Sequence, residues 1–415
     1  MPSSSSRRFI FIDVLRSLAI ALALLAHALN DFDVPGRLSE AEYVALRGLT
    51  RAAAPTFIFL FGMMLELVYA RRARSNGLAT VVPHLLWRSL QCYAGYLATV
   101  CAGVLFGLFG WTHALQAAVF IFGAHHGNIL KYYTVALVVA VPLLAARQRL
   151  GLKRTLALCV GIWLLSPLLN GIAALPVGRF GGLLSLLTQM LPYSLTFIGA
   201  GMWVGNSLRR GASLSRSVHT HAGLVLIACA SVGGVLIWMM GPQTVLFSYL
   251  DYYAFRNSYH VGYYAIGLLQ ATGLCLLFFH LFPLHHSVLR PTSPLLAFGR
   301  SSLLSFTLGN IVLNGLVGRL TLTPHGGLLL TLGYLAFVLG LVLLFERVLG
   351  YLRSHPRLAV AERPFTLLRH HLIGPASAAL VFTGRVSLQR LGHLLPASAA
   401  GPRTEAKTAD GVSQG

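Results

Sequence analysis

The chain has 415 residues, of which 56% are hydrophobic and only 10% are charged, and its mean hydropathy is +0.71. Soluble domains are about 25% charged, so this composition excludes an ordinary soluble enzyme and indicates a polytopic membrane protein. The formal net charge of +21 does not predict nucleic-acid binding. The basic residues lie in short loops between apolar segments, where positive charge directs membrane topology.

The predicted fold is an all-α, polytopic membrane helix bundle of about ten transmembrane helices, since a helix needs about 20 apolar residues to cross a bilayer. The arginine- and lysine-rich loops alternate across the membrane only if the shorter apolar segment 110–128 stays on the exterior side as a re-entrant or interfacial element. Both termini are then cytoplasmic. The predicted spans are 9–29, 52–70, 85–109, 129–146, 155–172, 189–207, 219–240, 260–282, 295–318 and 326–349.

The sequence divides into two predicted regions. Residues 1–350 form the predicted transmembrane domain, and residues 351–415 form a basic cytoplasmic tail. The apolar but arginine-interrupted part of this tail predicts an interfacial helix, and its polar end predicts disorder. No internal repeat is evident, which weakens the interpretation as a transporter, since many transporters contain repeats.

Three ionisable residues lie in the first apolar span, where such groups are expensive and usually functional. Asp13 precedes Arg16 by three positions, so its carboxylate can hold the guanidinium. His27 follows Arg16 by 11 positions, which on a helix is within about 20° of alignment and about 16 Å along the axis. The result is a polar stripe with an arginine near the cytoplasm and a histidine near the exterior. The structural alternative is a snorkelling arginine and a histidine bonded to a neighbouring helix.

A basic cluster is predicted on the cytoplasmic side, at the end of the second span and the start of the third. Arg71, Arg74 and Arg88 there, with Arg300 at the ninth span, are candidates to bind the phosphates of a nucleotide-containing donor. Anchoring by positive loops is the alternative for Arg71 and Arg74. Asn310 lies further along the ninth span with a second asparagine four residues on, where both amides can bond across helices.

The exterior side holds candidates for binding a polar substrate. Asp31 follows the first span, and Asp251 and His260 flank a tyrosine-rich stretch suited to stacking on sugars. An aromatic belt at the membrane interface explains the same tyrosines. The pair at 125–126 has no third metal ligand at a sensible spacing, so no metal site is predicted. Walker, GxSxG, HExxH and Rossmann motifs are absent from the sequence.

The segment from Arg8 to Ile20, RFIFIDVLRSLAI, with His27 after it, resembles the opening signature of the acyltransferase-3 superfamily of membrane acyltransferases. The second span, which contains PTFIFLFG at 55–62, is similar to that family's phenylalanine-rich second helix. A closer resemblance is to the OpgC-like branch, the periplasmic glucan succinyltransferases. Four segments carry this resemblance: LVYARR at 67–72, RSLQCY at 88–93, GNILKYY at 127–133 and FGRSSLLSF at 298–306.

The resemblance implies an integral O-acyltransferase of a bacterial inner membrane. It would transfer an acetyl or succinyl group from cytoplasmic acyl-CoA, a donor substrate and not a bound cofactor, to a hydroxyl of an extracytoplasmic glycan or glycolipid. His27 would act as general base or through a transient acyl species, while Arg16, held by Asp13, would orient the donor or the oxyanion. Arg88, Arg71, Arg74 and Arg300 would bind the CoA phosphates.

Two other functions stay open from the sequence. A glycan or small-molecule transporter could use the same polar stripe without acyl transfer, and a structural membrane component could use its polar residues only to join helices. The expected partners are membrane lipid, acyl-CoA and the acceptor, with no nucleic acid. The oligomeric state is not predicted.

Overall fold

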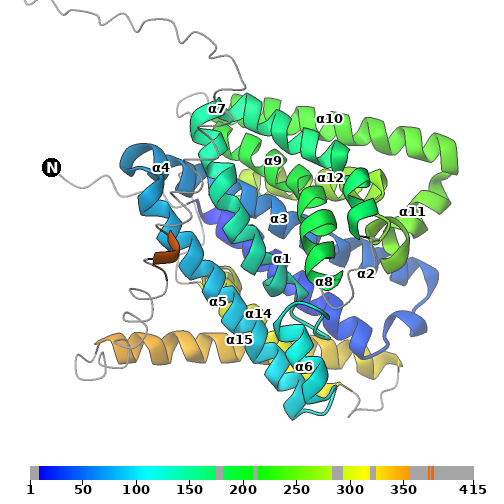
Figure 1. Cartoon of the computed structure of the whole chain (residues 1–415). Coiled ribbons are helices and arrows are strands. Elements are labelled where there is room, and N and C mark those ends of the chain that lie inside the picture. The colour runs from blue at the N-terminus through cyan, green and yellow to red at the C-terminus, as the bar shows by residue number, and fades with distance from the viewer. Residues whose placement is uncertain are drawn as a thin grey trace, which may run out of the picture.

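The computed structural model describes residues 9–173, 181–208, 214–282, 293–317, 324–354, 373 and 375–377 (Figure 1). About 89% of the described residues are helical and none of them forms a strand. The predicted all-α membrane bundle is therefore confirmed. Most of the predicted tail, 351–415, lies outside the described residues, as do residues 1–8; the last long helix ends at Ser354.

Long α-helices cover the predicted apolar segments, and shorter α-helices, π-helices and 3-10 turns lie between them, among them the 3-10 turn η1 (Pro35–Arg37). In chain order, the other helical elements are α1 (Ile10–Asp31), α2 (Glu40–Arg51), α3 (Ala53–Met64), η2 (Leu65–Ala70), α4 (Arg71–Asn76), α5 (Leu78–Leu105), α6 (Trp111–Ala118), α7 (Asn128–Ala173), α8 (Gly181–Ser185), η4 (Leu186–Met190), α9 (Leu191–Leu208), α10 (Leu214–Met240), α11 (Pro242–Leu250), η6 (Tyr252–Arg256), α12 (Val261–Leu281), η7 (Pro294–Leu296), α13 (Ala297–Arg300), α14 (Ser302–Leu316) and α15 (Pro324–Ser354).

Six helices of the described chain are long and apolar enough to cross a membrane: 10–31, 40–76, 128–168, 217–240, 261–281 and 327–351. α14 is apolar but shorter, and α5 and α9 cover two further predicted spans. α7 contains both predicted spans 129–146 and 155–172, because its helices are joined at Gly151, whose φ of 77° and ψ of 174° are not helical. A multi-pass membrane protein is thus confirmed, while the count of ten crossings and the cytoplasmic termini stay predictions.

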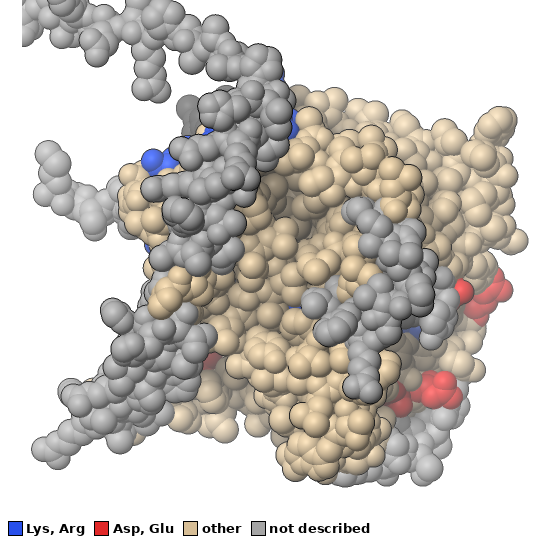
Figure 2. All heavy atoms as spheres, viewed as in Figure 1, with Lys and Arg blue, Asp and Glu red and all other residues tan. Residues whose placement is uncertain are grey.

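The outer helices expose their apolar side chains. In an apolar stretch of 18 residues, only 17% of the residues are buried in α10 and 22% in α15, whereas 67% are buried in the helical segment 40–76. α10 and α15 lie at opposite edges of the bundle, with α1, α3 and α9 between them (Figure 1). In Figure 2 the visible described surface is mostly uncharged, with the larger basic patches toward the left edge and the larger acidic patches at the right edge. This is the surface that a surrounding bilayer requires.

The closest helix packing in the interior joins α3 and α9. A Cβ atom added to Gly62 would overlap the carbonyl oxygen of Ile198, and one added to Gly201 would overlap that of Phe59. These glycines let the two backbones touch, as small residues do in membrane helix pairs. The second span is held in this way beside the middle of the bundle.

The segment 110–128 does not span the membrane. Its helix α6 has eight residues, about 12 Å, and the chain then returns through a loop at 119–127. Lys131 Nζ fastens this loop by donating to the carbonyls of Phe120 at 3.2 Å and Phe122 at 3.3 Å. The end of this loop carries His126, whose ring lies against His27 of α1.

Candidate functional site

The arginine of the polar stripe is held between α1 and α13. Arg16 Nη1 lies 3.7 Å from Asp13 Oδ1, which confirms the predicted pairing, and donates to the carbonyl oxygen of Gly299 at 3.4 Å. The backbone N–H of Gly299 donates to Ser17 Oγ at 2.8 Å. A Cβ atom at Gly299 would strike the Asp13 carbonyl, so only glycine allows α13 to approach α1 this closely. The guanidinium is therefore positioned from two helices.

The histidine of the stripe is held from α14 and from the loop 119–127. His27 Nδ1 lies 3.2 Å from Oδ1 of Asn310, a fully buried side chain. With the amide oxygen facing the ring, this contact is a hydrogen bond in the tautomer that carries its hydrogen on Nδ1, and that is the tautomer whose Nε2 can accept a proton. The ring stacks on His126, with centroids 4.8 Å apart and planes 17° apart, and meets the edge of Phe306 at 5.8 Å. These contacts fix the position and the plane of the His27 ring.

Asp31, at the outer end of α1, meets two consecutive histidines. Its Oδ2 lies 2.6 Å from His126 Nε2 and its Oδ1 lies 3.2 Å from His125 Nε2. The side chains of Asp31 and His126 are only 7% and 5% exposed, whereas that of His125 is 45% exposed. The hydrogen bond from Asp31 raises the pKa of His125. Local spacing did not predict this cluster, because 94 positions separate Asp31 from His125 and no third ligand lies near the two histidines in the sequence.

On the predicted cytoplasmic side, the half-buried side chain of Tyr69 lies within the electrostatic range of three arginines, and these four residues are called the Tyr69 cluster here. The charges of Arg88, Arg16 and Arg72 all act on its hydroxyl. Arg88 is exposed and its Nη1 donates to Gln91 Oε1 at 3.2 Å. The predicted Arg88 and the stripe residue Arg16 thus act on the same hydroxyl, as does Arg72, which was not among the predicted donor-binding residues.

The remaining predicted donor arginines have other surroundings. Arg74 Nη2 lies 3.2 Å from the buried carboxylate of Glu66, which also accepts two bonds of 2.8 Å from Arg147. Arg300 Nη2 lies 2.6 Å from Glu346. Both therefore join helices, whereas Arg71 is exposed at the start of α4.

The two other predicted exterior residues are placed around η6. Asp251 is exposed at the end of α11. His260 Nδ1 accepts from the N–H of Gly262 at 3.1 Å, which caps α12, and its ring stacks on Phe255 at 4.2 Å. Arg256, which lies between them, acts electrostatically on His27. The turn therefore brings a cation, and not the predicted His260, into range of the site.

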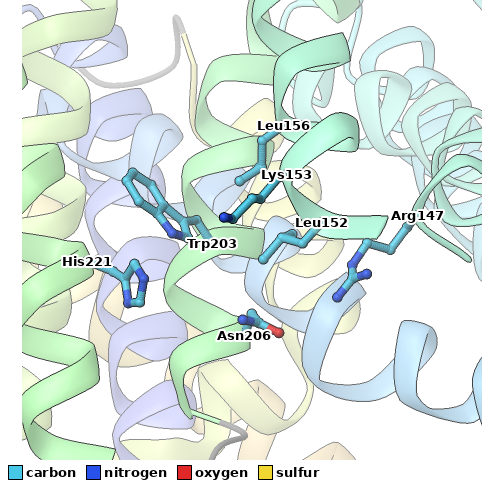
Figure 3. Close-up of a pocket in the computed structure, with 7 residues that line it drawn as sticks. All are labelled: Arg147, Leu152, Lys153, Leu156, Trp203, Asn206 and His221. Atoms are coloured by element: carbon cyan, nitrogen blue, oxygen red, sulfur yellow. The ribbon is translucent and has the colours of Figure 1, made fainter. Parts of the chain in front are cut away.

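A separate cavity of about 370 Å³ lies between α7, α9 and α10 (Figure 3). Arg147 and Lys153 give it a basic character, which favours an anionic group. Two of its polar side chains are already engaged in the fold: Arg147 binds Glu66, and His221 Nδ1 lies 2.7 Å from Ser207 Oγ. The lining residues are Arg147, Leu152, Lys153, Leu156, Trp203, Asn206 and His221.

Residues 8–240 match the family model described as heparan-alpha-glucosaminide N-acetyltransferase, catalytic. No curated protein and no solved structure matches the chain. The matched region contains the polar stripe, the Asp31 cluster and the Tyr69 cluster, but not Gly299 or Asn310. The predicted transferase and membrane classes are confirmed, and the acyltransferase-3 and OpgC-like assignment stays a prediction. Because the match covers more than half of the chain, the protein belongs to the heparan-alpha-glucosaminide N-acetyltransferase catalytic family of membrane acyltransferases.

Proposed function

We propose that the protein is an integral membrane O-acyltransferase of a bacterial inner membrane. It moves an acetyl or succinyl group from cytoplasmic acyl-CoA to a hydroxyl of an extracytoplasmic glycan or glycolipid. The proposal rests on one observation: in a member of this acyltransferase family, a membrane-embedded histidine, His27, is held by Asn310 and by its stack on His126. We infer that its hydrogen lies on Nδ1, so that Nε2 acts as a base. A transporter has no need for such an oriented base.

In the proposed reaction, His27 Nε2 takes the proton of the acceptor hydroxyl as its oxygen attacks the thioester carbonyl. The carbon–sulfur bond then breaks, and the CoA thiolate leaves with the proton returned by His27. General base catalysis by a positioned histidine contributes about 10²–10⁴-fold. The pantetheine arm of CoA is the part of the donor that would extend from Arg16 along the stripe to His27, about 16 Å along the helix axis.

The donor phosphates are proposed to bind at the Tyr69 cluster. Arginine binds phosphate oxygens through two parallel N–H bonds, and the charges of Arg88, Arg16 and Arg72 all act on Tyr69. Arg71 is exposed beside them and can contribute. Arg74 and Arg300 are left out of this proposal, because carboxylates already bind their guanidinium groups.

An amine acceptor is the second candidate. The family description names N-acetyl transfer to a glucosaminide, and the same base could serve an amino group. The product distinguishes the two, since an ester is cleaved by alkaline hydroxylamine and an amide is not. The acceptor side in either case is the end of α1 at His27, Asp31 and Arg256.

The test measures transfer of radiolabel from acetyl-CoA or succinyl-CoA to glycan in membranes containing the protein. His27→Ala is expected to lower the rate about 10²–10⁴-fold, and Arg16→Ala to raise the KM for the donor and lower kcat. Arg149→Ala, which removes an exposed arginine outside the site, is expected to leave the rate unchanged.

Retention of the wild-type rate by both His27→Ala and Arg16→Ala would exclude the proposal. Substrate movement across the membrane without release of the CoA thiol would favour the transporter. Label found on His27 after a quench without acceptor would replace direct transfer by the two-step route through an acyl-histidine.

A further inference from the structure

The exterior end of the bundle contains three potential metal ligands to which the proposed acyl transfer assigns no chemical step. They are Asp31, His125 and His126, whose ligand atoms all lie within 4.8 Å of one another. Both imidazoles direct the same atom, Nε2, at the same carboxylate, one at each of its oxygens. Two imidazoles and a carboxylate that converge in this way form a donor set typical of zinc enzymes.

The distances suit an ion of that size. Zinc lies about 2.0–2.2 Å from each nitrogen or oxygen ligand, so tetrahedral ligands stand about 3–4 Å apart. The two N–O separations of 2.6 and 3.2 Å and the limit of 4.8 Å require only small side-chain rotations to admit an ion. Each Nε2 hydrogen would then reside on Nδ1, which leaves Nε2 as the metal ligand.

The protein holds the ligands in place from both sides. Asp31 is the last residue of α1. The two histidines lie in the loop 119–127, which Lys131 holds through the carbonyls of Phe120 and Phe122. His113 Nε2 bonds the carbonyl of Gly123 in the same loop at 3.0 Å. The His126 ring is also fixed by its stack on His27. Such outer contacts orient ligands and strengthen metal binding.

Burial is unequal across the three residues. Asp31 and His126 are almost closed off, whereas His125 is 45% exposed and forms the open side. Catalytic zinc sites have this form, with three protein ligands and a fourth position open to water or substrate. Structural zinc sites instead close all four positions with protein ligands.

We propose that Asp31, His125 and His126 bind one divalent transition-metal ion, with Zn²⁺ as the ion of best fit, and leave one coordination position open beside His27. A hydroxyl bound at that position would lose its proton more easily, since zinc acidifies bound water and alcohols. The ion-binding site itself does not depend on the proposed acyl transfer.

The experiment uses the full chain purified in detergent, stripped with a chelator and then given Zn²⁺ or Co²⁺ without any acyl donor. The wild-type protein is expected to retain about one zinc per chain by mass spectrometry and to show the visible absorption of tetrahedral Co²⁺. Asp31→Asn and His126→Gln should lose both signals. His280→Gln, an exposed histidine outside the site, should retain them.

His125→Gln keeps the test valid if the buried variants fail to fold, because its side chain is half exposed. Its affinity for zinc is expected to fall about 100-fold, the upper end of the loss seen for residues that only support a ligand. Stoichiometric binding that survives in all three variants, or a monodisperse wild-type protein that retains neither ion, would overturn the proposal. The cluster would then be a metal-free hydrogen-bonded group.

Discussion

At the residue scale, the tautomer of His27 depends on one amide. In the proposed mechanism, Asn310 Oδ1 accepts from the N–H at Nδ1, so Asn310 acts through His27 as a positioning residue. A neutral histidine without that acceptor divides its hydrogen between both nitrogens and rotates more freely. The orientation of the proposed base is therefore supplied from α14.

Asn310→Ala is expected to lower kcat about 10-fold to 100-fold, with little change in the KM for acyl-CoA, since the donor cluster lies at the other end of α1. Outer contacts to functional histidines typically have effects of this size. Asn310→Asp, which retains an acceptor, should recover part of the rate. Steady-state kinetics in proteoliposomes measures both parameters.

Asn314→Ala is the matched control on the same helix. Its Nδ2 donates to the carbonyl of Thr99 at 3.1 Å, so its loss should lower thermal stability without lowering kcat. If Asn310→Ala and Asn314→Ala reduced kcat equally, the positioning role of Asn310 would be wrong.

Residue spacing predicted contacts within one helix but not those between helices. Asp13 and Arg16 pair because three positions bring side chains to one helix face. The contacts of His27 with Asn310, 283 positions away, and of Asp31 with His126, 95 positions away, depend on how helices pack. The sequence predicts that Asn310 bonds across helices, but only the folded structure shows that its partner is His27.

At the element scale, α3 and α9 touch through glycine. The same hydropathy that predicted both spans gives no sign that Gly62 and Gly201 define their contact, because composition does not reveal which face meets which. The joined spans of α7 show the converse: the basic loop after 146 was predicted, yet the helix continues through it except at Gly151.

Gly201→Ala is expected to destabilise the protein by about 1–3 kcal/mol, the usual cost of adding atoms to a packed interior. Its Cβ would overlap the Phe59 carbonyl, which belongs to backbone and cannot rotate away. Gly233→Ala in α10 is the control, because nothing lies within 4 Å of its Cβ position. Thermal unfolding in detergent should separate the two variants, and equal stabilities would disprove the tight α3–α9 contact.

At the scale of the whole molecule, two contacts bear on topology. Arg16 meets Gly299 and His27 meets Asn310, both with a separation of 283 positions, so α1 and the α13–α14 segment run parallel. Parallel direction is what the alternation of basic loops predicts for the first and ninth spans. This agreement supports the predicted topology without counting every crossing.

Cysteine labelling tests that topology. In a chain with Cys101→Ala, Ser258→Cys should react with a membrane-impermeant maleimide from the exterior, and Ser75→Cys only after permeabilisation, because both serines are exposed on opposite predicted sides. Gel shifts report the labelling. Reaction of both cysteines from the same side would contradict the predicted arrangement.

The contacts of α1 with α13 and α14 also constrain how the protein is made. Gly299 and Asn310 are each synthesised 283 residues after the partner that they contact, Arg16 and His27 respectively. The newborn first helix must therefore wait, with its ionisable groups in or near lipid, while hundreds of residues are translated. A ribosome that stopped after residue 240 would release the whole family-matching region without the Asn310 amide that contacts His27.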